Sequence, residues 1–142
     1  MTFEPLVVVD AANTVGAVPD GWWRDRHGAT ERLRDALAPL AVHGFPDGAD
    51  VPQWARRRPL EVVLVVEGAA RDVASVPGIR VEAAPGSGDD RMVELLERAA
   101  RQAPDRPLLL VSADRALRER ACAHGAVCAG PRAVRTVGGE GR

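Results

Sequence analysis

The sequence predicts an α/β fold, a three-layer α/β/α sandwich in which helices cover both faces of a central parallel sheet. Short apolar runs at residues 6–9, 62–66, 79–83 and 108–111 have the length of buried strands. Most of them are apolar throughout rather than alternating with polar residues, which is typical of strands with both faces covered. Helical patterns separate the later runs, and this alternation favours parallel strands with right-handed crossovers.

The first half of the chain is predicted to contain two strands, one helix and two long loops. A loop at 14–28 follows the first strand, because Gly16, Pro19, Gly21 and Gly28 interrupt any helical pattern. A helix then opens at Thr30, with leucines at helical spacing on its apolar face. An irregular loop at 43–59 carries Trp54 and the run Arg56-Arg57-Arg58, and it leads into the second strand.

The second half alternates more regularly between helical and extended segments. A short helical stretch at 69–75 precedes the third strand, and a strongly amphipathic helix at 89–103 follows it. A fourth helix is expected at 114–123, a short fifth strand at 126–128 and a last turn at 131–134. Residues 1–135 are expected to form one domain, with a disordered Gly-rich tail at 136–142.

Composition limits the classes of partner. The formal net charge of -1 gives no global attraction to nucleic acid or to an anionic membrane, so any such partner needs a local basic patch. All nineteen basic residues are arginine. Cys122 and Cys128 lack the spacing of a zinc site and are expected to be buried free thiols. No targeting or membrane-spanning segment is apparent, so we expect a cytoplasmic protein.

Acidic residues follow several of the predicted strands. Asp10 ends the first apolar run directly, Glu67 follows the second, and Asp114 comes shortly after the fourth. Asp89 and Asp90 begin the helix after the third strand. The carboxyl ends of parallel strands meet at one edge of a sheet, where ligands bind. Carboxylates that meet there repel one another unless a cation neutralises them, and a set of hard oxygen ligands suits Mg²⁺ or Mn²⁺.

Each acid also has a purely structural explanation. Asp89 before a helix is a good N-cap, and Asp90 in the first turn suits the helix dipole. Asp114 is equally a candidate cap for the fourth helix, with Ser112 as an alternative cap, and Glu67 is a candidate solvated charge. Asp10 is the hardest to explain structurally, because it terminates a wholly apolar run. Taken together, the acids favour a metal site.

Three motifs resemble, in order and spacing, those of NYN-domain proteins, a group of PIN-like nucleases. They are residues 8–13 (VVDAAN), 88–93 (GDDRMV) and 111–114 (VSAD), and the similarity extends from residue 6 to about 134. Residues 20–26 (DGWWRDR) are similar to a feature of a bacterial branch of this group.

The resemblance implies a sheet with strand order 3-2-1-4-5, a cleft between strands one and four, and Mg²⁺- or Mn²⁺-dependent cleavage of RNA. By position it implies an acidic catalytic site with Asn13 as its polar neighbour, made of Asp10, Asp89, Asp90 and Asp114. We expect Asp10, Asp90 and Asp114 to hold one or two metal ions, with Asp89 as either a further ligand or a residue that orients the others. Some members of the family carry a further Asp four residues after the last of these acids, and here that position is Arg118.

Other residues are candidates for substrate binding. Asn13 and Ser112 lie beside the acids in the sequence, and Arg24 and Arg26 have the charge to hold phosphates. Trp22 has a face on which a base can stack, although adjacent tryptophans also commonly cover the edge of a core. The tryptophan loop and the arginine run are alternatively surfaces of a homodimer.

The leading hypothesis is a metal-dependent phosphodiester hydrolase, an endoribonuclease acting on single-stranded RNA. The alternative is a non-catalytic module of the same fold that binds RNA, a nucleotide or a protein partner. A haloacid-dehalogenase-like phosphatase is disfavoured, because such an enzyme needs a second Asp two residues after the first and Ala12 stands there.

Overall fold

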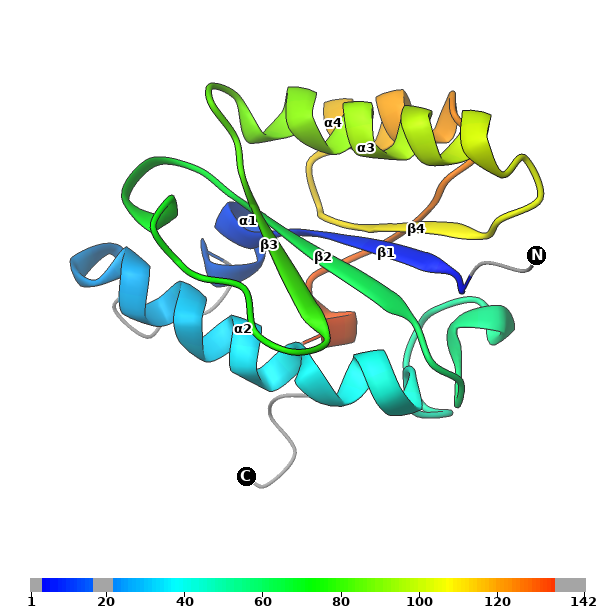
Figure 1. The fold of residues 1–142 in the computed structure, drawn as a ribbon, viewed down its shortest axis with the longest axis horizontal. Helices are drawn as coiled ribbons and strands as arrows, with labels where there is room; N and C mark the ends of the chain where they lie inside the picture. The colour runs from blue at the N-terminus through cyan, green and yellow to red at the C-terminus, as the bar shows by residue number, and fades with distance from the viewer. Residues whose placement is uncertain (1–3, 17–21, 135–142) are drawn as a thin grey trace.

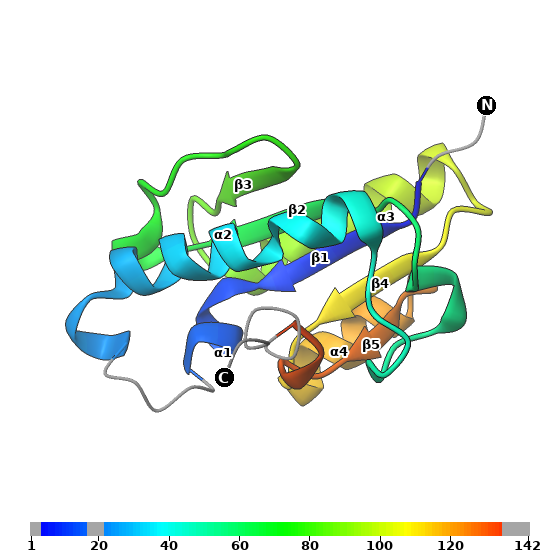
Figure 2. The same cartoon turned by 90° about the horizontal axis from the view of Figure 1, so that it is seen from below.

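A five-stranded parallel sheet forms the centre of the molecule (Figures 1 and 2). The computed structural model describes residues 4–16 and 22–134. The strand order β3-β2-β1-β4-β5 agrees with the order that the family resemblance implies. The strands are β1 (Leu6–Asp10), β2 (Glu61–Val66), β3 (Ile79–Ala83), β4 (Leu108–Val111) and β5 (Val127–Ala129). The predicted three-layer α/β/α class is therefore confirmed.

Helices cover both faces of this sheet. In Figure 1, α3 and α4 lie on one face and α2 lies on the other. The helices are α1 (Ala11–Gly16), α2 (Arg26–His43), α3 (Gly88–Gln102) and α4 (Arg115–Cys122). Three short 3₁₀ turns, η1 (Trp22–Arg24), η2 (Gln53–Ala55) and η3 (Gly68–Ala70), lie between them.

The central strand β1 contributes to two separate hydrophobic cores, because successive side chains of a strand point to opposite faces. Val7 and Val9 pack with Leu37 and Leu40 of α2 on one side. Leu6 and Val8 pack on the other side with residues of α3 and α4. The unbroken apolar run thus reflects burial on both faces, and Asp10 is the first polar residue of the strand.

The helices near the N-terminus differ from the predicted ones. Part of the loop expected at 14–28 is helical, and α2 begins at Arg26 rather than at Thr30. Asp25 is the N-cap of α2, since its Oδ1 accepts a hydrogen bond from the Gly28 amide at 2.9 Å. A Cβ at Gly28 would collide with the Asp25 carboxylate, so this glycine permits the cap instead of breaking the helix.

Two further expectations need correction. The helical stretch predicted at 69–75 is reduced to the single turn η3. The cysteines are free as expected, but they are not buried: Cys122 is exposed and Cys128 is half-buried. Partial burial, together with the neighbouring Cys122 thiol, raises the pKa of Cys128 to about 11. The tail predicted at 136–142 lies outside the described residues.

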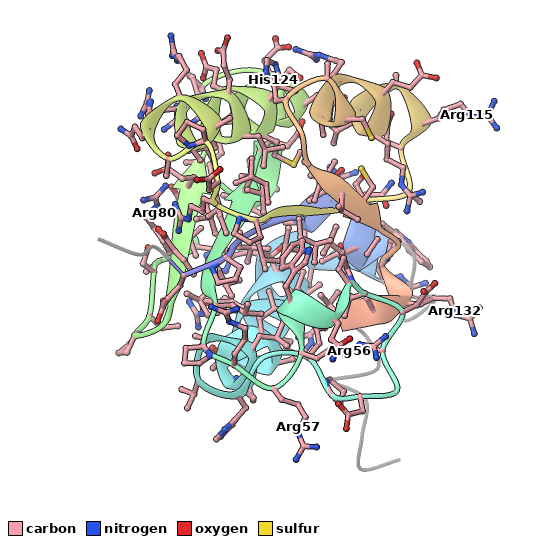
Figure 3. All side chains as sticks on the ribbon, turned by 90° about the vertical axis from the view of Figure 1, so that its right-hand side faces the viewer. Arg56, Arg57, Arg80, Arg115, His124 and Arg132 are labelled. Atoms are coloured by element: carbon pink, nitrogen blue, oxygen red, sulfur yellow. The ribbon has the colours of Figure 1, made fainter. Side chains whose placement is uncertain are left out.

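Two arginines and several backbone hydrogen bonds stabilise the loop between α2 and β2. Arg56 donates through Nη2 to the carbonyls of Ala49 and Val51, at 3.2 and 3.0 Å. Arg57 forms an ion pair with Asp47 (Figure 3). The loop leads into the first residue of β2, so it lies toward the amino edge of the sheet, away from Asp10. No helix in the described ranges is long and apolar enough to cross a membrane.

Candidate acidic site at the carboxyl edge of the sheet

Asp10 is a buried carboxylate at the carboxyl end of the central strand, with 6% of its surface exposed. Its Oδ1 accepts a hydrogen bond from the Asn13 amide at 3.2 Å, and its Oδ2 accepts one from the Ser112 hydroxyl at 2.9 Å. Burial raises the pKa of Asp10, and the nearby Asp89 and Glu67 raise it further; the two hydrogen bonds act in the opposite direction. The surroundings of Asp10 therefore disfavour the charged form of its carboxyl group.

Ser112 joins the ends of β1 and β4. Its hydroxyl donates to Asp10 and accepts a hydrogen bond from the Asp114 amide at 3.1 Å. A second link runs parallel to the first, because Asn13 Oδ1 accepts from the Ala113 amide at 2.9 Å. Side chains of the first and third motifs are thus connected across about a hundred residues of sequence.

Asp114 is the N-cap of α4, as its structural explanation predicts. Its Oδ1 accepts a hydrogen bond from the Leu117 amide at 3.0 Å. A carboxylate has two oxygens, and this cap uses only one of them. Capping and a role in a site are therefore compatible for Asp114.

The two acids at the start of α3 have different surroundings. Ser87, not Asp89, is the N-cap of α3, since its hydroxyl accepts from the Asp89 and Asp90 amides at 3.1 and 3.4 Å. Burial raises the pKa of Asp89, and repulsion from Asp114 and Asp90 adds to this, against the attraction of Arg120. Asp90 instead forms an ion pair with Arg120 at 2.9 Å, which joins α3 to α4.

Asp89 is therefore the acid of this pair that interacts electrostatically with both Asp10 and Asp114. The sequence predicts Asp90 as a metal ligand and Asp89 as either a ligand or an orienting residue, and both assignments stay predictions. Arg120, which forms the ion pair with Asp90, is not part of any of the three motifs. It lies thirty residues away from Asp90, in another helix.

Glu67 approaches the start of α3 over Gly88. A Cβ at Gly88 would collide with the Glu67 carboxylate, so the glycine makes room for this side chain. Glu67 is exposed, yet it is close enough to raise the pKa of Asp10. The signal in the sequence is its place just after β2, which puts it at the same edge of the sheet as the other acids.

The residues predicted to bind substrate lie in two regions, one around Asp10 and one near the start of α2. Asn13 and Ser112 are within the hydrogen-bonded network of Asp10. Arg24 and Arg26 are exposed, near the start of α2, and Arg24 lies over the ring of Trp23, 5.8 Å from its centroid. Trp23 is 56% exposed. Trp22 belongs to η1, but its side chain lies outside what the structure describes.

The chemistry of the acids suits a hard divalent cation, because carboxylate oxygens are the preferred ligands of Mg²⁺ and Mn²⁺. Burial raises the pKa values of Asp10 and Asp89, and repulsion from neighbouring acids raises them further; a bound cation would relieve that repulsion. Within residues 4–16 and 22–134, however, no three His, Cys, Asp or Glu side chains are grouped closely enough to hold a metal ion. The donors fit by type, and they would have to move closer to act as one ligand set.

Comparison with solved structures supports the assignment of the fold. No family model matches the sequence, and no curated protein matches it. The structure is similar to Rae1 (YacP) from Bacillus subtilis with a TM-score of 0.66 and 16% identity, covering 93% of this chain and 74% of that one. A single-substitution variant of Rae1 aligns with a TM-score of 0.65 and the same identity over 75% of its length. The chain therefore shares the α/β fold of Rae1.

Proposed function

We propose that this protein is a metal-dependent phosphodiester hydrolase, an endoribonuclease that cleaves single-stranded RNA in the cytoplasm. The observation that carries the proposal is the network from Asp10 through Ser112 to Asp114, with Asp89 repelled by the other acids. Like charges gathered at the ligand-binding edge of a parallel sheet destabilise a fold, and such features concentrate at functional sites. The structural similarity to Rae1 gives weak additional support.

Asp10, Asp89 and Asp114 are the residues that would hold Mg²⁺ or Mn²⁺, with Asp90 as a further ligand if it leaves Arg120. A bound divalent cation supplies an activated water and stabilises negative charge on the phosphate oxygens. Ser112 and the Asn13 amide orient the two oxygens of Asp10 through the hydrogen bonds described above. Arg24 and Arg26 would bind backbone phosphates of the RNA strand beside the acids, and a base would stack on Trp22.

The test is a cleavage assay on single-stranded RNA of mixed sequence with Mn²⁺ or Mg²⁺, comparing wild type with Asp10→Asn. Asp105→Asn is the matched control, since it removes a carboxylate from an exposed loop before β4, at the opposite edge of the sheet. Cleavage that requires the metal, is lost in Asp10→Asn and is retained in Asp105→Asn would support the proposal. Equal cleavage by Asp10→Asn and wild type would refute the assignment of the site.

A non-catalytic RNA-binding module is the second candidate. The ion pair of Asp90 with Arg120 favours it, because one of the implied ligands is already neutralised by a side chain. A pure binding protein would retain its affinity for RNA in a chelator, lose it as salt rises, and leave the RNA intact with either metal.

A further inference from the structure

Arg118 lies across the carboxyl ends of β4 and β5. Its Nε donates a hydrogen bond to the carbonyl of Ser112 at 2.6 Å. Its Nη2 lies 3.8 Å from the position that a Cβ on Gly130 would take, just past the end of β5. The guanidinium is therefore at the same edge of the sheet as the acids, on the β5 side of Ser112.

Arg118 differs in its partners from the other arginines that are shielded from water. Arg56 forms no ion pair within the described ranges, but its Nη2 is already hydrogen-bonded to the carbonyls of Ala49 and Val51. Arg91 forms ion pairs with Glu82 and Glu94, and Arg106 forms one with Glu61. Arg118 is half-buried, yet it forms no ion pair with a carboxylate of the part of the chain that the structure describes. Taking a cation partly out of water without a counter-ion costs free energy, and an anion bound at this position would offset that cost.

The single hydrogen bond to Ser112 also fixes the direction of the side chain. A guanidinium has five N–H donors in a rigid planar fork, and anchoring Nε leaves the four N–H groups of Nη1 and Nη2. Two parallel N–H groups of such a fork match two oxygens of one phosphate. Ser112 is also hydrogen-bonded to Asp10, so the fork and the acids are held by the same residue from opposite sides.

We propose that Arg118 binds a backbone phosphate of the RNA strand, next to the phosphodiester that lies at the acids. The inference rests on the proposed function for the identity of its anion, but it concerns binding and not cleavage. It gives a role to the position at which this chain departs from the acid found in some NYN-domain proteins: a fixed positive charge contacts the strand where those proteins place a further carboxylate.

The experiment measures binding of a fluorescein-labelled single-stranded 12-mer RNA by anisotropy, in EDTA and over a series of salt concentrations. The variant is Arg118→Gln, and Arg115→Gln is the matched control. Arg115 is also on α4 and carries the same charge, but it is exposed and projects away from the sheet (Figure 3).

We expect Arg118→Gln to weaken binding by about tenfold, since a charge-assisted hydrogen bond of this kind contributes that order of affinity. We also expect the slope of log K against log salt to fall by about 0.7, the value for one lost phosphate contact on a single strand. Arg115→Gln should change affinity by less than about twofold, as expected for an exposed charge without a contact.

A purely structural role for Arg118 as a clamp on the Ser112 carbonyl predicts a different pattern. Arg118→Gln would then lower the melting temperature and leave the salt slope unchanged, and this result would overturn the proposal. Arg118→Lys keeps the charge without the fork, so we expect it to retain the wild-type slope with weaker binding; a slope as low as that of Arg118→Gln would contradict a phosphate contact. Failure of the wild type to bind RNA would also overturn the inference, whereas Arg118-dependent binding without cleavage would support it and refute only the proposed hydrolase.

Discussion

The charged residues at the amino ends of the strands differ in their pairing from those at the carboxyl ends. At the amino edge, Glu61 at the start of β2 pairs with Arg106 and Arg80, so opposite charges neutralise each other. At the carboxyl edge, Asp10, Asp89 and Asp114 are like charges, and the pKa values of the first two are raised. At the carboxyl edge Asp90 is neutralised by Arg120, whereas Asp10, Asp89 and Asp114 remain as neighbouring like charges, which the metal of the proposed function would neutralise.

The largest expected effect comes from Asp10→Asn at the carboxyl edge. We expect cleavage of RNA to fall by more than about a hundredfold, since loss of a group that only orients a metal ligand already costs 10- to 100-fold. The same change should raise the melting temperature at pH 7, because the folded state holds this carboxylate at a pKa above its ordinary value of 3.8.

The sign of this effect follows from linkage. A carboxylate whose pKa is raised by folding destabilises the folded state at pH values above that raised pKa, and the penalty disappears below the unfolded value. The stability advantage of Asp10→Asn should therefore shrink as the pH falls toward 4, which thermal unfolding from pH 7 to pH 4 will measure. If Asp10→Asn is less stable than wild type at pH 7, the charged Asp10 carboxylate does not destabilise the folded state and this interpretation is wrong.

Ser112→Ala should damage both activity and stability. The hydroxyl hydrogen-bonds both Asp10 and the Asp114 amide, and its loss leaves a buried carboxylate with one partner fewer. We expect a loss of about 2 kcal/mol in the free energy of unfolding, the range for a hydrogen bond to a charged group. Urea denaturation will measure it. Ser75→Ala is the control, because it removes an exposed hydroxyl that is hydrogen-bonded to a neutral amide, that of Val81, and not to a carboxylate. A loss no larger than that of the control would show that Asp10 does not depend on Ser112.

Glu61→Gln tests the amino edge. Arg106 is almost fully buried and loses its charged partner, but Glu61 is 42% exposed, so solvent compensates for part of the loss. We expect destabilisation of about 1 kcal/mol, the upper range for a partly exposed pair, with cleavage of RNA unchanged. Unfolding and cleavage are measured on the same preparation. If Glu61→Gln instead lost RNA cleavage without losing stability, the two edges would not differ in the way that we propose.

The smallest effect is expected for Gly88→Ala. The new Cβ would displace the Glu67 carboxylate, but this side chain is exposed and can rotate away. We expect the free energy of unfolding to change by no more than about 0.5 kcal/mol, because only the end of one flexible side chain has to move. Denaturation in urea will check this, and a loss of several kcal/mol would mean that Glu67 is held firmly at the site.

The sheet could be predicted from the sequence because both faces of its strands are covered, which leaves uninterrupted apolar runs such as residues 62–66. The gathering of the acids also follows from local sequence, since each acid lies at or after a strand end. The start of α2 could not be predicted in this way, because a glycine that normally interrupts a helix here makes room for the Asp25 cap.

The surroundings of the two acids of α3 could not be predicted either. Asp89 and Asp90 are adjacent and chemically identical, and only the fold determines that Arg120 of α4 pairs with Asp90. For the same reason the unpaired charge of Arg118 is visible only once β5 is in position. The motifs therefore identify candidate residues, but contacts between elements far apart in the sequence determine which partner each of them has.

The strand order also has a consequence for the synthesis of the chain. β1 is made first, yet it lies between β2 and β4, so one side of it remains unpaired until residue 111 has been added. A nascent chain that ends after β3 can form only the β3-β2-β1 half of the sheet, with an exposed apolar strand edge. Ser112 and Asp114 follow β4 directly, so the pairing of β4 with β1 also brings together the two ends of the network around Asp10.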